Sequence, residues 1–126
     1  MKYLTITNLT NSQVQPVVAH YCASFLCQLR GLMFRRSLPA SEGLLLVQSK
    51  DSRLDSSIHM MFMWIDLAIV WINNANEVVD VRLARRWRLA YVSQQPARYV
   101  LELNVARLDD FKVGDKLQFS EAWVDK

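Results

Sequence analysis

His59 is the residue with the clearest potential for chemistry. The stretch 57–63 has the pattern of an extended strand, in which alternate side chains share a face, so Ser57 would lie beside His59. An imidazole can act as a general base or bind a ligand when a carboxylate fixes its tautomer, and Asp66 or Glu102 could supply that carboxylate. A hydrogen-bonded structural histidine is the alternative that the sequence leaves open.

The same alternation places thioether groups beside this histidine. Met61 and Met63 would share the face of His59. Imidazole and thioether ligands together suit Cu(I), so a cuprous site is conceivable. Methionine also fills irregular gaps in protein cores, and we therefore expect no metal ion and no other cofactor. The set of His59, Met61 and Met63 is kept as the weaker alternative.

Arginines crowd the segment 82–98, which contains no acidic residue. The basic residues are Arg82, Arg85, Arg86, Arg88 and Arg98, with Trp87, Tyr91 and Tyr99 among or beside them. Guanidinium groups bind phosphates and carboxylates through paired hydrogen bonds and stack on aromatic rings, so the segment could form an anion-binding or interaction surface. Strand alternation would instead send the arginines to both faces, with the tryptophan packed as a lid over the core.

Two carboxylates interrupt apolar stretches. Asp66 lies between two hydrophobic segments, and Glu102 lies within a predicted strand. Because an unpaired charge is costly in apolar surroundings, we expect each to pair with an arginine or to cap a turn. Acid and base work would require two such groups within several Å of each other, which spacing along the chain does not establish.

Around these residues the hydrophobic pattern predicts a mostly β domain. Strands are expected at 2–7, 44–47, 58–64, 67–72, 77–85, 99–103 and 116–119, with a hairpin turn at 73–76. One short helix is expected between Ser24 and Gly31 and a second at 105–111, while 17–22 fits either a strand or a helix start. Many short strands without crossover helices favour a small antiparallel sandwich or barrel-like fold of the α+β class, with one or two short helices.

Size and charge limit the classes of function. The 126 residues fit a single domain, 1–126, and no apolar run reaches the roughly 18 residues of a membrane span. The net charge of +3 is too small to indicate nucleic acid by itself, so we expect neither a nucleic-acid nor a membrane partner. The N-terminal residues lack the apolar region of a signal peptide, which predicts a cytoplasmic location.

The two cysteines, Cys22 and Cys27, are five positions apart. This spacing fits neither a redox pair nor a zinc pair. On a helix the two side chains would point about 140° apart. We therefore expect two buried free thiols.

Three stretches together resemble a known family. They are Arg30-Gly31-Leu32-Met33-Phe34-Arg35, the run Pro-Ala-Arg-Tyr-Val-Leu-Glu-Leu at 96–103, and Val113-Gly114-Asp115. Leu38, Gly43, the run 57–60, Asp66 and Arg86-Trp87-Arg88 follow the same order. Over residues 19–119 the chain is similar to the domain of unknown function 192 family.

The resemblance implies a compact β-rich fold of sandwich or barrel type, with a short helix before Gly-Leu-Met, in a family found mainly in prokaryotes. It implies no established activity and no catalytic residue. Trp64 and Ile65 stand where similar sequences usually have a proline before Asp66, so we expect a different turn there. At 104–106 the chain reads Asn-Val-Ala where Pro-Ala-Gly is common.

The sequence supports three hypotheses about function. The first is a domain that binds a small, anionic ligand or a partner, as a monomer or small homo-oligomer. Its candidate site consists of Ser57, His59, Asp66, Arg86, Trp87, Arg88, Arg98 and Glu102. The second is an enzyme that uses His59 with a carboxylate as acid and base, although no nucleophile or phosphate-loop motif supports catalysis. The third is an interaction protein that acts through the arginine and tryptophan segment 82–98.

Overall fold

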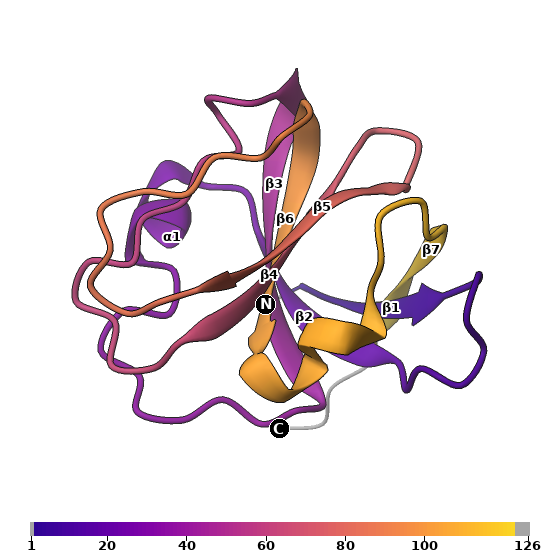
Figure 1. Cartoon of the computed structure of the whole chain (residues 1–126), viewed down its shortest axis with the longest axis horizontal. Coiled ribbons are helices and arrows are strands. Elements are labelled where there is room, and N and C mark those ends of the chain that lie inside the picture. Colours follow the sequence, from indigo (N-terminus) through magenta and orange to yellow (C-terminus); the bar gives the residue numbers. More distant parts are fainter. Residues whose placement is uncertain (1, 123–126) are drawn as a thin grey trace.

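A computed structural model describes residues 2–122 (Figure 1). Its elements in chain order are β1 (Tyr3–Asn8), β2 (Val17–Cys22), α1 (Phe25–Arg30), β3 (Glu42–Ser52), β4 (Leu67–Ile72), β5 (Val78–Ala84), β6 (Ala97–Asn104), the 3-10 helix η1 (Val105–Asp110) and β7 (Leu117–Ala122). The expected α+β fold with mostly β structure and two short helices is confirmed for this part of the chain. The ambiguous stretch 17–22 is a strand.

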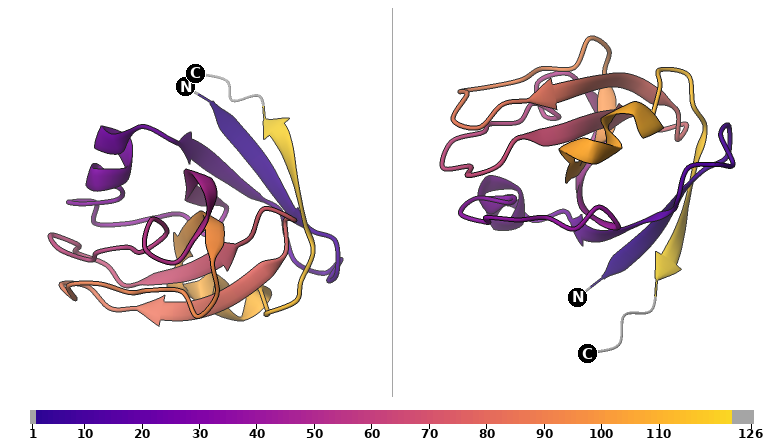
Figure 2. Two further views of the ribbon diagram at one scale, coloured as in Figure 1. Left: turned by 90° about the horizontal axis from the view of Figure 1, so that it is seen from above. Right: turned by 60° about the horizontal axis from the view of Figure 1, so that its bottom comes forward.

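The strands form one curled sheet in the order β5-β4-β6-β3-β2-β1-β7. The first and last strands are neighbours, with Tyr3 opposite Ala122, and both views of Figure 2 show β1 beside β7. At one end the two sheet edges approach each other, where the Val78 amide donates to the Asp115 carbonyl at 2.9 Å. The sheet is therefore barrel-like but open.

One pair of strands departs from the expected antiparallel arrangement. β2 and β3 are parallel, with Tyr21 opposite Leu45. Parallel neighbours require a crossover connection, and here residues 23–41, which include α1, provide it. The sheet is consequently mixed, and α1 is the crossover helix that the sequence pattern did not reveal as one.

Two apolar clusters pack on the opposite faces of the sheet. The first takes residues from all seven described strands, on the concave face. The second lies on the other face of the sheet. It combines strand residues with side chains of the loops that cover this face, such as Leu32 and Ile58. All six residues of β4 are buried, since Val70 faces the first cluster and Trp71 the second. This explains why β4 reads as a continuous apolar run rather than an alternating one.

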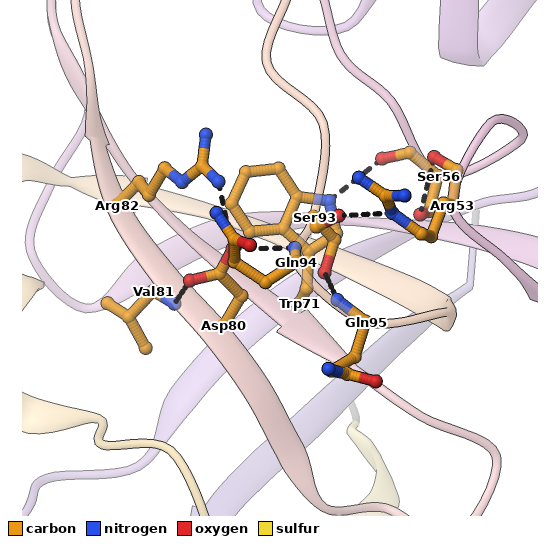
Figure 3. A network of polar contacts seen from close by, with 9 residues as sticks. All are labelled: Arg53, Ser56, Trp71, Asp80, Val81, Arg82, Ser93, Gln94 and Gln95. Atoms are coloured by element: carbon orange, nitrogen blue, oxygen red, sulfur yellow. Dashed lines mark hydrogen bonds and ion pairs between the residues drawn. The ribbon is translucent and has the colours of Figure 1, made fainter.

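The covering loops are fixed to the sheet by polar contacts (Figure 3). The buried Trp71 indole donates to the Ser56 carbonyl at 2.8 Å, and Arg53 Nε donates to the Ser93 carbonyl at 2.9 Å. The backbone amide of Gln94 donates to the Asp80 carboxylate at 3.0 Å. Two of these bonds connect β4 and β5 to the loops that follow β3 and β5, and the Arg53 bond joins the two loops to each other. The loops are thereby held in place on the sheet.

The strand expected at 58–64 is absent. This stretch makes a single antiparallel bridge, between Ile58 and Tyr91, and then turns, with the Met63 amide donating to the Met60 carbonyl at 3.3 Å. Ile58, Met60 and Met63 are all buried, which is a spacing of two and then three and not the strict alternation of a strand. The stretch therefore lacks the strand alternation from which His59, Met61 and Met63 were expected to share a face.

Cys22 and Cys27 form a disulfide, so the expectation of free thiols is wrong. Cys22 ends β2 and Cys27 lies in the first turn of α1, with a change of direction between them. The two Cα atoms are 5.7 Å apart, within the usual range for a bridge. The helical geometry that would have separated the side chains does not apply, because only one of the two residues is helical.

Neither short helix in the described residues has the length and apolar content needed to cross a membrane.

Candidate functional site

Glu102 is buried without a partner. It lies in β6 between Leu101 and Leu103, which face the first cluster, so its own side chain points into the second, apolar cluster. Only 5% of the residue is exposed, and among the described residues its carboxyl group makes no hydrogen bond or ion pair. The expected pairing with an arginine is wrong. Burial raises the pKa of Glu102 to about 7.

Glu102 borders a cavity of about 50 Å³, here called the polar cavity. Ser57 and His59 also line it, which brings three of the candidate residues together. His59 Nε2 lies 3.0 Å from the Leu29 carbonyl, so Nε2 carries a proton and donates. His59 Nδ1 is then a buried acceptor, and it has no hydrogen-bond partner. Two unsatisfied polar groups therefore border one cavity with room for a few water molecules or a small polar group.

The helix α1 and the glycine after it form the roof of this cavity. The Ser24 hydroxyl accepts from the Cys27 amide at 3.2 Å, so Ser24 is the N-cap of the helix that was expected between Ser24 and Gly31. Gly31 follows the helix with a φ of +49°, in the left-handed region that favours glycine. A Cβ atom on Gly31 would lie 3.7 Å from Glu102 Oε1, so this turn passes directly over the buried carboxyl group.

Side-chain amides fix the helix above the cavity. Gln28 Nε2 donates to the Val47 carbonyl at 2.8 Å, and Gln48 Nε2 donates to Gln28 Oε1 at 2.9 Å. No residue of α1 is buried, so these bonds and the disulfide hold the helix more than apolar packing does.

A larger cleft of about 840 Å³ lies on the other side of the same turn. Its buried apolar floor includes Cys22, Leu32, Leu38 and Leu44. Its polar lining consists of Tyr3, His20, Tyr21, Ser24, Arg30, Arg35 and Glu42. The segment 30–33 borders both the cleft and the polar cavity, so a single layer of chain separates them.

The cleft has two uncommitted cationic groups. The guanidinium groups of Arg30 and Arg35 make no hydrogen bond or ion pair with any residue that the structure describes. The pKa of His20 is lowered, chiefly because partial burial disfavours its charged form. The cleft therefore offers two permanent positive charges beside a neutral imidazole, against the single carboxylate of Glu42.

Asp66, Arg86, Trp87 and Arg88 lie elsewhere, at a surface formed by three loops. Asp66 Oδ1 accepts from the Arg86 amide at 2.8 Å and from Arg86 Nε at 3.2 Å, which confirms that Asp66 pairs with an arginine. The backbone hydrogen bond from Arg86 is the main reason why the pKa of Asp66 is lowered. Trp87 packs against Phe62 and Trp64 rather than lying as a lid over the core.

Arg98 lies apart from both groups. Its Nε donates to the Gln48 carbonyl at 2.9 Å and its Nη1 donates to Asn74 Oδ1 at 2.7 Å, beside the β4–β5 turn. Its guanidinium group also stacks on Tyr99, 5.2 Å from the ring centre. The eight candidate residues thus fall into three separate places, of which only the polar cavity joins a histidine to a carboxyl group.

Sequence reasoning missed the cleft and one wall of the polar cavity. Arg30 and Arg35 belong to the motif that carried the family resemblance, but no sequence pattern indicated that the two side chains line a common cleft. Met33 lines the polar cavity together with Met63, whereas Met61 does not. The turn after Gly31 was the available signal, because a glycine with positive φ often marks a close backbone approach.

Comparisons with known proteins show the family and the fold. The model of the domain of unknown function 192 family, described as Uncharacterized ACR, matches residues 6–119. A UPF0127 protein of Thermococcus gammatolerans is 34% identical over 116 residues, which cover 90% of this chain and 74% of that protein. A UPF0127 protein of Pyrococcus furiosus is 28% identical over 115 residues, covering 90% of this chain and 96% of that protein.

Two crystal structures share the fold. A Sinorhizobium meliloti protein, described as a proposed transcription regulator, has a TM-score of 0.79 at 20% identity and covers 94% of this chain and 92% of its own. A Novosphingobium aromaticivorans protein of unknown function has a TM-score of 0.75 at 24% identity, covering 92% and 83%. At such identities the likeness concerns the fold alone. By the match of its family model over most of its length, the chain belongs to the domain of unknown function 192 family.

Proposed function

We propose that this protein binds a small organic anion in the cleft of about 840 Å³. The observation that carries the proposal is the pair of uncommitted guanidinium groups, Arg30 and Arg35, beside a buried apolar floor. Guanidinium groups bind carboxylates and phosphates through paired hydrogen bonds, and an apolar floor favours an apolar body. The ligand class is therefore a carboxylate, phosphate or sulfonate attached to an apolar or aromatic group.

The cleft chemistry supports an anion over a cation. Arg30 and Arg35 stay charged at every physiological pH, whereas Glu42 is the one carboxylate among the lining residues. His20 and the two tyrosines of the lining offer neutral hydrogen-bonding groups. A ligand that places its charge near the arginines would gain charge-assisted hydrogen bonds without displacing an existing partner.

The test uses anilinonaphthalene sulfonate, an apolar aromatic sulfonate whose fluorescence rises on binding. We expect saturable binding at one site, weakened about tenfold or more in the variant Arg30→Gln/Arg35→Gln, since hydrogen bonds to charged groups contribute about 1.5–3 kcal/mol. The matched control is Arg85→Gln/Arg88→Gln, which removes the same charge away from the cleft and should bind the dye normally. Equal loss in both variants, or a loss in the control alone, would overturn the proposal.

A second candidate is acid and base catalysis, favoured by the polar cavity. Glu102 with a pKa of about 7 and the unpartnered Nδ1 of His59 border one space, which is the arrangement that a proton-transfer site requires. Hydrolysis of the smallest formate esters would test it, because the cavity of about 50 Å³ has no room for a larger substrate. The rate should change with a midpoint near pH 7 and disappear in Glu102→Gln. Turnover that persists in that variant, or its absence in the parent protein, would exclude this candidate.

A further inference from the structure

Four aromatic side chains form an exposed cluster at the end of the molecule where three loops meet. Phe34, Phe62, Trp64 and Trp87, here called the aromatic tip, are 60%, 44%, 47% and 45% exposed. Their rings are in a continuous series, with centroid separations of 5.6 Å for Phe34 and Phe62, 5.5 Å for Phe62 and Trp87, and 5.9 Å for Trp64 and Trp87. A contiguous exposed patch of large apolar rings usually marks an interaction site, because soluble proteins rarely leave such a patch open to water.

The backbone beneath this tip is strained. Four non-glycine residues in the described chain have positive φ, and three of them are Phe34, Phe62 and Trp87, at 67°, 60° and 67°. Bulky residues rarely adopt this conformation, for which glycine or asparagine would be easier. Hydrogen bonds hold it, from the Phe34 amide to the Phe62 carbonyl at 3.0 Å and from the Trp87 amide to the Met60 carbonyl at 2.8 Å. Stability alone does not explain aromatic rings at these positions.

Arginines, and no lysine, stand next to the residues of the tip in the sequence, and two of them, Arg36 and Arg86, contact Trp64. The arginine collar consists of Arg36, Arg85, Arg86 and Arg88, and its neighbouring acidic residue, Asp66, is bound to Arg86. Arg36 lies over the Trp64 ring at 5.9 Å from its centre. The collar with Asp66 carries a net charge of +3, which equals the formal charge of the whole chain. This end of the molecule therefore has a charge that repels a second copy and attracts an acidic surface.

We propose that the aromatic tip and its arginine collar form a docking surface for an acidic segment of another protein. Tryptophan, phenylalanine and arginine are enriched at the centres of protein interfaces, whereas lysine is depleted there. Trp87 meets Phe62 at 66° and Trp64 at 89°, so the rings do not form a parallel series on which successive bases would stack. The mutual packing also fixes the rings before binding, which lowers the entropic cost of docking.

The test measures binding of a fluorescent random copolymer of glutamate and tyrosine by anisotropy at low salt. We expect Arg36→Gln/Arg88→Gln to weaken binding about tenfold or more, while the charge-matched control Lys50→Gln/Lys112→Gln binds like the parent protein. Trp87→Gly removes a ring where glycine suits the backbone, so binding should fall without loss of the thermal unfolding midpoint. Dye binding in the cleft should be unchanged in these tip variants, which separates this proposal from the proposed function.

Parallel titrations with polyuridylate and with phosphatidylglycerol vesicles identify the class of partner. Tighter binding to either of these, with the same dependence on Arg36 and Arg88, would overturn the protein-docking proposal in favour of a nucleic acid or a lipid surface. Equal weakening in the lysine control would show that the copolymer recognises net charge alone, and it would overturn the proposal as well.

Discussion

The Glu102 carboxyl group and His59 Nδ1 border the same polar cavity, and each lacks a hydrogen-bond partner among the described residues. In a structure of this size most buried polar groups are paired, so two orphans in one place are informative. These two groups lower the free energy of unfolding relative to a protein with apolar side chains in their places.

Replacing Glu102 by glutamine should remove a pH dependence of stability. The folded-state pKa of about 7 lies above the ordinary value of 4.5, so the folded protein binds a proton that the unfolded chain releases. The contribution of the protonated Glu102 to the free energy of unfolding is complete below about pH 4.5, and it is lost as the pH rises through about 7. At pH 8 we expect Glu102→Gln to be more stable than the parent protein by about 3 kcal/mol in urea unfolding.

The control for this prediction is Glu42→Gln, which alters an exposed glutamate. Its stability should follow the pH profile of the parent protein. A parent protein that shows no greater loss of stability than Glu102→Gln between pH 4.5 and 7 would contradict the raised pKa.

His59 should exist as the tautomer with its proton on Nε2. Nε2 faces the Leu29 carbonyl at 3.0 Å, and a lone pair in that position would be repelled. Long-range nitrogen–proton NMR correlations distinguish the two tautomers directly. Detection of the Nδ1-protonated form would mean that the imidazole is turned and that the carbonyl of Leu29 is not its partner.

Loss of the Cys22–Cys27 disulfide should lower the free energy of unfolding by about 2 kcal/mol, because the bridge closes a short loop. The double variant Cys22→Ser/Cys27→Ser tests this by chemical unfolding. Since no residue of α1 is buried, we also expect weaker dye binding in the cleft that this helix borders. Thiol titration of the native, unreduced protein should find no reactive thiol, and two titrating thiols would contradict the bridge.

Gly43→Ala should be destabilising by roughly 1–3 kcal/mol through overpacking. A Cβ atom there would lie 2.7 Å from Leu103 Cδ2 and 3.0 Å from the Glu102 carbonyl oxygen, and the backbone oxygen has little freedom to move. The exposed neighbour Ser41 provides the control variant Ser41→Ala, which should unfold at the same temperature as the parent protein. If both variants have the same thermal unfolding midpoint, β3 and β6 can move apart enough to accommodate the extra methyl group, and the prediction is wrong.

Local patterns predicted the elements well where one face of a strand or a cap determined them. The hairpin of β4 and β5 and the helix from Ser24 to Gly31 followed from turn residues and capping chemistry. The predictions failed where packing between distant parts of the chain determined the structure. The apolar stretch around His59 gains more by covering the second cluster than by extending the sheet, so its side chains do not alternate.

The candidate site was predictable only in part. The pairing of Asp66 with an arginine followed from the cost of an isolated charge, and it is confirmed. The same reasoning failed for Glu102, because the chain leaves this carboxyl group protonatable instead of supplying a partner. The cleft depends on the parallel crossover between β2 and β3, a long-range feature that no local pattern of residues encodes.

The pairing of β1 with β7 has a consequence for how the sheet forms. Tyr3 and Ala122 lie opposite each other although almost the whole described chain separates them. One edge of β1 therefore stays unpaired until β7 is in place. Such distant pairing slows folding, and the unpaired edge meanwhile favours association of partly folded chains.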